Sequence, residues 1–535
     1  MSPQNRHGQL AIILHAHLPF VRHPEHPDFL EEDWLFEAIT ETYIPLLRIF
    51  LGLEADQIPF KITMSLTPTL CEMLRDPLLQ ERYVRHIDRT IALARSELER
   101  TRDMPDIHEQ ARAYFDHFLR CRTLFVETWG RDLVKVFAGM QDRGFLEIIT
   151  CGATHGFLPL MSQFPEAIRA QLLIARDSYR ECFGRDPRGI WLPECGYFEG
   201  LEAFLQEANL KWFTIDSHGL MLGRPRPQFA IYAPCFTPSG PAVFARDRAS
   251  SRQVWSAEEG YPGNHAYRDF YRDVGFDLST DYLRPFLPAD GRRKFTGIKY
   301  HRITGRVKEK DSYKRIWAMA AVEADAGDFV HHRIQQFDNL LSGTNIEPIV
   351  VAPFDAELFG HWWFEGPEFL NLFIRKAARD QRVFRLTTPG DYLERHPTWQ
   401  MIRPSASSWG HMGYSEVWLD QTNGWVYPHL HSATQRMIEV ATAEDITKKI
   451  DPTRERALRQ LARELLLAQS SDWAFLMKTG TAREYATKRT KDHILRFNKL
   501  HEQIVGDRVD PSFLEFCEGR DNLFPALDWH YYRNQ

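Results

Sequence analysis

The sequence is poor in cysteine and contains no long apolar stretch. Seven cysteines are scattered over 535 residues, and no pair has CxxC spacing. This pattern argues against a disulfide framework and against a structural zinc site. No run reaches the ~18 apolar residues that a membrane helix needs, and the N-terminal MSPQNRHGQ has no signal-peptide core. We therefore expect a cytoplasmic protein without a membrane partner.

A strong excess of either charge is also missing. Lys plus Arg number 66 and Asp plus Glu number 72, which gives a formal net charge of −6. No long basic run occurs, so the sequence does not suggest a nucleic-acid partner. Internal repeats and low-complexity segments are absent as well. A neutral partner suits this charge balance better than a polyanion does.

Aromatic residues are plentiful, with 14 Trp, 18 Tyr and 36 Phe. Most of these rings are expected to lie in the core. The remainder would offer apolar faces with a polar handle, and such faces suit the CH-rich faces of sugars.

The chain is too long for one ordinary core, because single cores stop growing near ~250–300 residues. Short apolar runs alternate with helical patterns over the first two thirds, which predicts a parallel sheet or barrel. The runs predicted to be strands are 11–15, 60–64, 146–151, 189–192, 212–215 and 348–352. They end in the polar clusters HAH, SLTP, GATHG, PECG, DSHG and PFDAE. In βα barrels, functional residues gather at the C-terminal ends of the strands.

Two segments have a helical pattern instead. Residues 76–144 are charged and have a 3.6-residue periodicity, which predicts a helical insertion. Beyond about residue 398 strand-like runs fade, and 443–505 reads as amphipathic helices. We expect a catalytic domain over 1–397, including the insertion, and a helical C-terminal domain over 398–535.

Glu194 lies in IWLPECGYFEG, directly after a predicted strand. Pro193 stiffens the turn, and Gly196 permits tight backbone geometry. A carboxylate on a rigid strand end suits a nucleophile, because attack depends on placement. A helix N-cap or a surface acid is the plainer alternative.

Asp355 lies in VVAPFDAELFGHWWFEG, again after an apolar run. Neighbouring aromatic rings would desolvate this carboxyl group and raise its pKa, as a general acid requires. Glu357 is the rival acid, and an N-cap role for Asp355 is the plainer alternative. Two carboxylates on different strand ends are the general equipment of glycoside hydrolysis.

A metal site is the competing interpretation. His15 and His17 form H-x-H at the end of the first predicted strand, and His155, Asp216 and His218 could complete a zinc site. Such a site would indicate a metal-dependent deacetylase or amidohydrolase. Histidines that hydrogen-bond within a polar barrel mouth are the third alternative.

Four motifs occur in order along the chain: HAHLPF (15–20), GATHGF (152–157), WLPECGY (191–197) and APFDAELFGHWWFEG (352–366). Together they resemble the successive motifs of glycoside hydrolase family 57, and within it those of the members that branch 1,4-α-glucans. SSWGHMGYSEVWLD (407–420) and SSDWAF (470–475) extend the resemblance. It implies an α/β fold, namely a distorted (β/α)7 barrel with a helical insertion and a C-terminal all-α domain.

The resemblance also implies roles for individual residues. Glu194 matches the nucleophile and Asp355 the acid/base of a retaining mechanism. No cofactor and no catalytic metal are implied, and the partner would be an α-glucan donor or acceptor chain. The positions that match substrate contacts are His15, His17, Trp34, His155, Trp409, Trp418 and Asp472, with Phe276 and Trp363 as weaker candidates for further ring contacts.

Three reactions share these two carboxylates: branching, 4-α-glucan transfer and α-amylase hydrolysis. Branching members carry a mobile loop with a tyrosine over the active site, and the corresponding stretch here is roughly 232–247. Its aromatic residues are Tyr232, Phe236 and Phe244, and a phenylalanine at the covering position would lack the hydroxyl. A non-enzymatic glycogen-binding module would need the aromatic residues but not the two acids.

Overall fold

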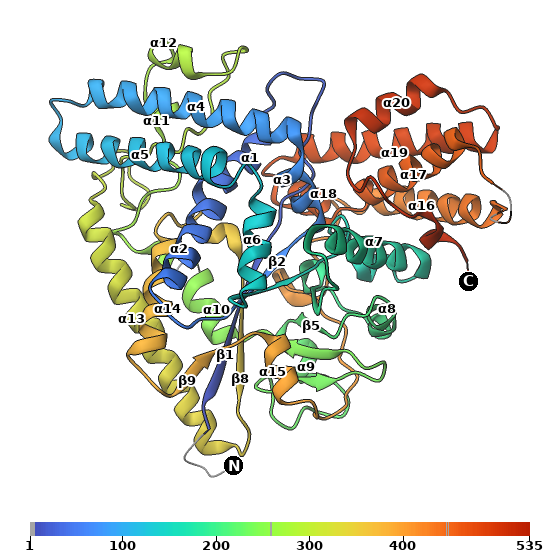
Figure 1. Cartoon of the computed structure of the whole chain (residues 1–535), viewed down its shortest axis with the longest axis horizontal. Coiled ribbons are helices and arrows are strands. Elements are labelled where there is room, and N and C mark those ends of the chain that lie inside the picture. The colour runs from blue at the N-terminus through green and yellow to red at the C-terminus, as the bar shows by residue number, and fades with distance from the viewer. Residues whose placement is uncertain (1–5, 257–258, 446, 448, 535) are drawn as a thin grey trace.

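The structure, a computed structural model, describes residues 6–256, 259–445, 447 and 449–534. It is a mixed α/β fold in which many helices surround parallel strands (Figure 1). The strands are β1 (Gly8–Ala16), β2 (Ile62–Leu66), β3 (Leu146–Ile149), β4 (Gly189–Trp191), β5 (Trp212–Ile215), β6 (Cys235–Phe236), β7 (Ala242–Ala245), β8 (Ile349–Asp355) and β9 (Phe384–Leu386).

Each of the six predicted runs coincides with or overlaps a strand. β1 and β8 extend beyond the predicted runs because their flanking residues are buried and paired as well. The sequence analysis missed β6, β7 and β9, which are only two to four residues long. Periodicity carries little information over so few residues.

The strands form two sheets, ordered β3-β2-β1-β8, with β9 beside β1, and β4-β5-β7-β6. Only the β6–β7 pair is antiparallel among the described strands. Two isolated parallel bridges, Thr150 with Ile190 and Arg246 with Val351, connect the sheets. Pairing therefore passes through β1, β2, β3, β4, β5, β7 and β8 and returns to β1. The carboxyl ends of these strands meet at one mouth.

The stretch 76–144 between β2 and β3 is helical. It contains α4 (Pro77–Arg100), α5 (Pro105–Thr123) and α6 (Leu133–Asp142). Asp76 caps the N-terminus of α4, because its side chain accepts a hydrogen bond from the Leu79 amide. α4 and α5 lie side by side as a long hairpin over one end of the molecule (Figure 1).

Further helices cover the strands. Those used below are α1 (Glu32–Ala38), α2 (Ile44–Ala55), α7 (Pro165–Phe183), α10 (Arg248–Trp255), α13 (Arg315–Gly343) and α14 (Gly366–Arg379). A π-helical turn, Ile39–Tyr43, connects α1 to α2. Such turns occur frequently at functional sites.

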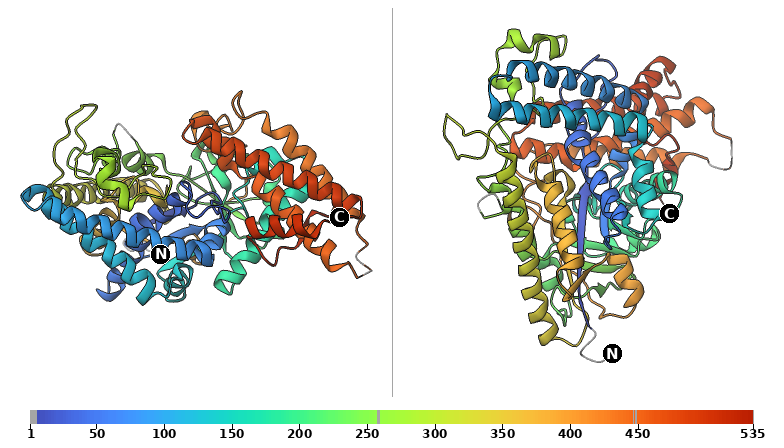
Figure 2. Two further views of the ribbon diagram at one scale, coloured as in Figure 1. Left: turned by 90° about the horizontal axis from the view of Figure 1, so that it is seen from above. Right: turned by 60° about the vertical axis from the view of Figure 1, so that its left-hand side comes forward.

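The described residues after β9 form helices and no strand. The longer helices of this region are α16 (Val426–Ala443), α17 (Pro452–Ala468), α18 (Ser471–Thr479), α19 (Arg483–Val505) and α20 (Pro511–Arg520). They gather on one side of the molecule, as both views in Figure 2 show. The domain boundary at 397–398 remains a prediction. Among the described residues, no helix has the length and apolar character to span a membrane.

Candidate active site

Glu194 occupies an unusual backbone conformation just after β4. It lies in the short 3₁₀ turn Pro193–Cys195, and its φ of 60° is left-handed, as is the φ of 50° at Cys195. Residues other than glycine rarely adopt this conformation, which costs ~1–3 kcal/mol each. The Trp409 amide donates a hydrogen bond of 2.9 Å to the Glu194 carbonyl and holds the turn in place. Because the surrounding structure holds Glu194 in this strained conformation, the residue is a candidate for function.

Two hydrogen-bond donors hold the Glu194 carboxylate. Trp409 Nε1 donates to Oε2 at 2.7 Å, and Ser471 Oγ donates to Oε1 at 2.8 Å. The residue is 8% exposed. Burial raises the pKa of Glu194 to about 7, although both bonds oppose the shift because they favour the charged form. Sequence reasoning missed Ser471, a small residue 277 positions away.

Asp355 ends β8 and lies beside His15 in the β1–β8 register. Burial, and then the negative charge of Glu194, raises the pKa of Asp355 to about 7. The two carboxyl groups therefore interact electrostatically within one site. Within the described part of the chain, no hydrogen bond reaches the Asp355 carboxyl group.

Glu357, the rival acid, is engaged differently. Its Oε1 accepts hydrogen bonds from Tyr43 Oη at 2.5 Å and from the His17 amide at 3.3 Å. Glu357 thus links the π-helical turn, the end of β1 and the turn after Asp355. This arrangement favours a positioning role for Glu357 and leaves Asp355 free to meet a ligand.

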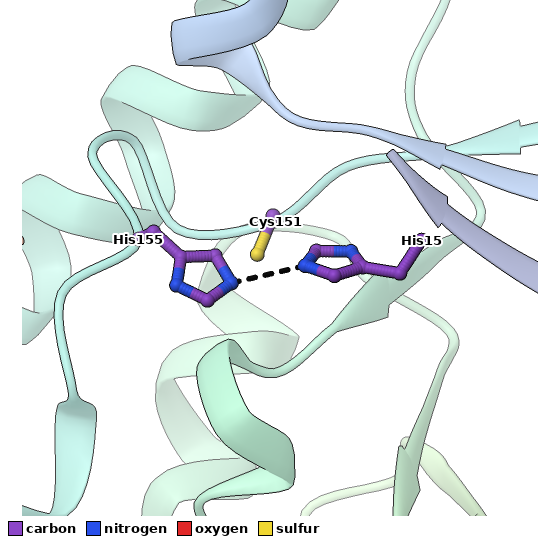
Figure 3. A group of neighbouring side chains, drawn as sticks. All are labelled: His15, Cys151 and His155. Carbon is purple, nitrogen blue, oxygen red and sulfur yellow. Dashed lines mark hydrogen bonds between the residues drawn. The ribbon is translucent and has the colours of Figure 1, made fainter. Parts of the chain in front are cut away.

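His15 and His155 face each other with a hydrogen bond of 3.0 Å between their Nε2 atoms (Figure 3). Ser65 contacts Nδ1 of His15 at 3.1 Å, and Ser471 contacts Nδ1 of His155 at 2.8 Å. The His15 ring also stacks on Trp191. Burial, followed by neighbouring histidines, keeps the pKa of both rings well below the ordinary value. Both histidines are therefore neutral at pH 7.

His17 differs because it has an anionic partner. Its Nε2 lies 3.0 Å from Asp472 Oδ2, and its ring stacks on His155 at 3.9 Å. Burial lowers the pKa of His17, but the negative charges of Asp472, Glu194 and Glu357 together outweigh burial and raise it. In return His17 holds the pKa of Asp472 at about 2 against the effect of burial. This pair joins the end of β1 to α18.

The five residues of the zinc hypothesis do not come together as one site. Asp216 pairs with Arg248 at 3.1 Å, and Nε2 of His218 donates to the Gly413 carbonyl.

At this mouth, two groups of described residues have donor atoms close enough for a metal ion: His15, Cys151 and His155, and His17, His155 and Asp472. Figure 3 shows the first group. Burial raises the pKa of the Cys151 thiol, which disfavours the thiolate that a metal needs. The hydrogen bonds described above already engage the ring nitrogens of these histidines. A site without a catalytic metal stays a prediction.

The predicted aromatic contacts differ in exposure. Trp409 reaches the carboxylate itself, as described above. Trp418 is only 1% exposed and stacks on Phe157, so its ring has no free face. Trp34 is partly buried and meets Tyr485 edge-on.

The two weaker candidates for ring contacts also differ in exposure. Phe276 is 45% exposed, whereas Trp363 is 2% exposed and packs on Tyr267 and Phe369. The accessible ring of the WW pair is instead Trp362, at 54%. The sequence alone could not show which of the adjacent Trp362 and Trp363 is buried.

None of the three aromatic residues of 232–247 covers the carboxylates. The Tyr232 carbonyl accepts from the Ile349 amide at the start of β8, Phe236 pairs with Ala242 at the start of β7, and Phe244 is buried inside β7. The first two positions lie toward the amino ends of the strands, whereas Phe244 packs edge-on against Trp212 and Tyr392 in the core. The segment that leaves β7 at the mouth begins at Arg246, and its α10 ends at Trp255, whose ring lies edge-on to Trp409.

Comparison with known proteins identifies the family of the chain. Residues 11–404 match the model of glycosyl hydrolase family 57, and residues 429–532 match the model of the 1,4-alpha-glucan branching enzyme C-terminal region. A 1,4-alpha-glucan branching enzyme of Thermococcus kodakarensis is 33% identical over 97% of this chain and 77% of its own.

The solved structures that resemble this chain carry two named activities. The alpha-amylase AmyC of Thermotoga maritima is 44% identical, with a TM-score of 0.93 over 99% of both chains. The family 57 branching enzyme of Pyrococcus horikoshii is 33% identical, with a TM-score of 0.88 over 99% of this chain and 97% of its own. The resemblance seen in the sequence is confirmed, and the chain belongs to glycosyl hydrolase family 57.

Proposed function

We propose that this chain is a 1,4-α-glucan branching enzyme that works by a retaining mechanism, with Glu194 as nucleophile and Asp355 as acid/base. One observation carries the mechanism: the Glu194 and Asp355 carboxyl groups interact at one mouth, and of the two only Glu194 receives hydrogen bonds from the described residues. Donors favour the charged form, so the shared proton resides on Asp355. A charged nucleophile beside a protonated acid is the state that the first step needs.

In that step Asp355 protonates the glycosidic oxygen while a Glu194 oxygen attacks the anomeric carbon. The C–O bond to the leaving chain breaks, and a β-linked glycosyl-enzyme forms. In the second step ionised Asp355 takes the proton of an acceptor hydroxyl, which attacks the same carbon and releases Glu194. The configuration is retained overall.

The acceptor decides the product. A glucan 6-hydroxyl gives an α-1,6 branch, a 4-hydroxyl gives 4-α-transfer, and water gives hydrolysis. The match of 429–532 to the branching-enzyme C-terminal region and the branching relatives support the first outcome. The 44% identity to an alpha-amylase favours hydrolysis as the second candidate.

The proposal includes the finer features expected from the sequence. The scaffold is a distorted (β/α)7 barrel with an all-helical C-terminal domain, and the closed ring of strand pairing supports the barrel. Donor and acceptor are α-glucans, as in glycogen biosynthesis. A reducing cytoplasm is the proposed compartment, supported by seven free cysteines.

Incubation with amylose tests the choice among the three reactions. α-1,6 linkages and new reducing ends are counted in the same samples, with Glu194→Gln as the inactive control. The proposal expects branches to outnumber new reducing ends. Reducing ends without branches would establish the amylase, and redistributed chain lengths without either would establish 4-α-transfer.

A further inference from the structure

A second cavity lies away from the two carboxylates. Its volume is about 310 Å³, and its walls come from α2, α5, the start of α13 and the start of α14. These elements lie together on the side of the molecule opposite the C-terminal helices (Figure 1). None of His15, His17, His155, Glu194 and Asp355 lines it. Cavities of this size hold small ligands.

Three arginines in the cavity wall carry unused donors. Arg48, Arg120 and Arg315 form no ion pair and no side-chain hydrogen bond within the part of the chain that the structure describes. Burial, and then the charge of Arg120, lowers the pKa of Arg48. An arginine offers five N–H donors in a planar fork, so these side chains present many unfilled donor positions.

Unused acceptors accompany these donors. Gln110 is buried, and its amide nitrogen donates to the Asp106 and Tyr313 carbonyls, while its Oε1 has no partner. The carboxylates of Glu109, Asp116 and Glu368 share the same wall.

This charge balance selects a class of ligand. Glu41 and Glu365 also line the cavity and Asp106 pairs with Lys314 at 2.5 Å, so carboxylates are at least as numerous as the three arginines. A phosphate group would therefore meet as much negative as positive charge. A neutral polyol fits better, because each hydroxyl donates to a carboxylate and accepts from an arginine.

Apolar surface completes the site. Tyr114 and Phe364 lie 6.0 Å apart with tilted rings, and Met319, Pro45 and Pro367 lie in the same wall. Arg268 packs over one Phe364 face at 3.9 Å. Sugars present CH-rich faces to such surfaces and hydroxyls to the polar groups around them.

We propose that this cavity is a second binding site for α-glucan, which takes one or two glucose units of a chain and tethers the polymer at a distance from the two catalytic carboxylates. This inference rests on the proposed function for the identity of the sugar.

Native electrophoresis in gels with and without glycogen tests the proposal. All variants carry Glu194→Gln so that no glycogen is consumed. Ala113 is exposed and lines the cavity, so Ala113→Trp fills it without removing a contact. Arg120→Ala and Arg315→Ala remove exposed donors, and Arg112→Ala, an exposed residue on the same helix outside the cavity, is the matched control.

The proposal expects glycogen affinity to fall about tenfold in the three cavity variants, for lost hydrogen bonds and packing, and to stay unchanged in Arg112→Ala. In the otherwise wild-type enzyme, Ala113→Trp should raise KM for glycogen and leave turnover of maltoheptaose unchanged. Unchanged retardation in all three variants would overturn the second site. A wild-type enzyme that binds glycogen at the cavity yet forms no branches would refute the proposed function alone.

Discussion

Glu194 is buried and Asp355 half-buried, but the two sides of the mouth differ most in their hydrogen-bond donors. On the Glu194 side, Trp409 and Ser471 donate to the carboxylate. On the Asp355 side, the described residues give that carboxyl group no hydrogen bond, and the nearby Glu357 takes the donor Tyr43. Burial raises the pKa of both Glu194 and Asp355 to about 7.

This difference teaches that hydrogen bonding decides which of the two carboxyl groups is charged and which carries the proton. Two donors stabilise the anion on one side, and their absence leaves the proton on the other. The region after residue 400 supplies both donors, so the C-terminal helices take part in setting the ionisation of a strand-end residue.

Removing either carboxylate should have the largest effect. Asp355→Asn is expected to lower kcat about 10²- to 10⁴-fold, because protonation of the leaving oxygen is lost. Glu194→Gln should lower kcat at least as far, since no covalent intermediate can form. Steady-state rates on amylose measure both effects.

Thermal unfolding is the control for these two variants. Each replacement is nearly isosteric, and both should fold as the wild type does. Appreciable branching by Glu194→Gln would remove the nucleophile assignment.

Trp409→Phe should produce the next largest effect, on the Glu194 side alone. It removes the 2.7 Å bond that favours the carboxylate, so the pKa of Glu194 should rise above about 7. Activity needs Glu194 ionised, and the acidic limb of the pH–rate profile should therefore move to higher pH. At pH 7 the loss should be about 10- to 100-fold, the value of a hydrogen bond to a charged group.

Trp473→Phe is the matched control. Trp473 is buried nearby and donates an equally short 2.7 Å bond, but to the Leu467 carbonyl. It should lower stability and leave the acidic limb in place. An unmoved acidic limb in Trp409→Phe would show that this donor does not set the charge of Glu194.

The positions of the two carboxylates were predictable from the sequence, because each depends on a short stretch of neighbouring residues. A strand and the polar cluster at its end are contiguous, so the positions of Glu194 and Asp355 at strand ends follow from short runs. Ser471 and Tyr43 are not contiguous with their partners and carry no periodic signal. Their contacts appear only once the chain is folded.

Tyr43→Phe should have the smallest effect, on the Asp355 side. It removes the 2.5 Å bond to Glu357, which tethers the turn after Asp355, and leaves the His17 amide in place. We expect ~1–2 kcal/mol less free energy of unfolding, the value of a buried hydrogen bond, and only a few-fold lower kcat. Chemical denaturation and steady-state rates give the two numbers.

Tyr83→Phe removes a 3.1 Å bond to Thr40 in the same π-helical turn and serves as the control. It should lower stability without lowering kcat. A loss of activity in Tyr43→Phe as large as in Trp409→Phe would mean that both sides depend on donors, and the comparison would fail.

The stereochemistry of azide rescue tests the central claim most directly. Asp355→Ala and Glu194→Ala are each given an activated α-glucosyl substrate and azide, and the anomer of the glycosyl azide is determined by NMR. If Glu194 is the nucleophile, Asp355→Ala still forms the β-linked intermediate, and azide opens it to the α-azide. Glu194→Ala should give the β-azide, because azide attacks the substrate directly. The opposite pairing of variants and anomers would contradict the assignment of both carboxylates.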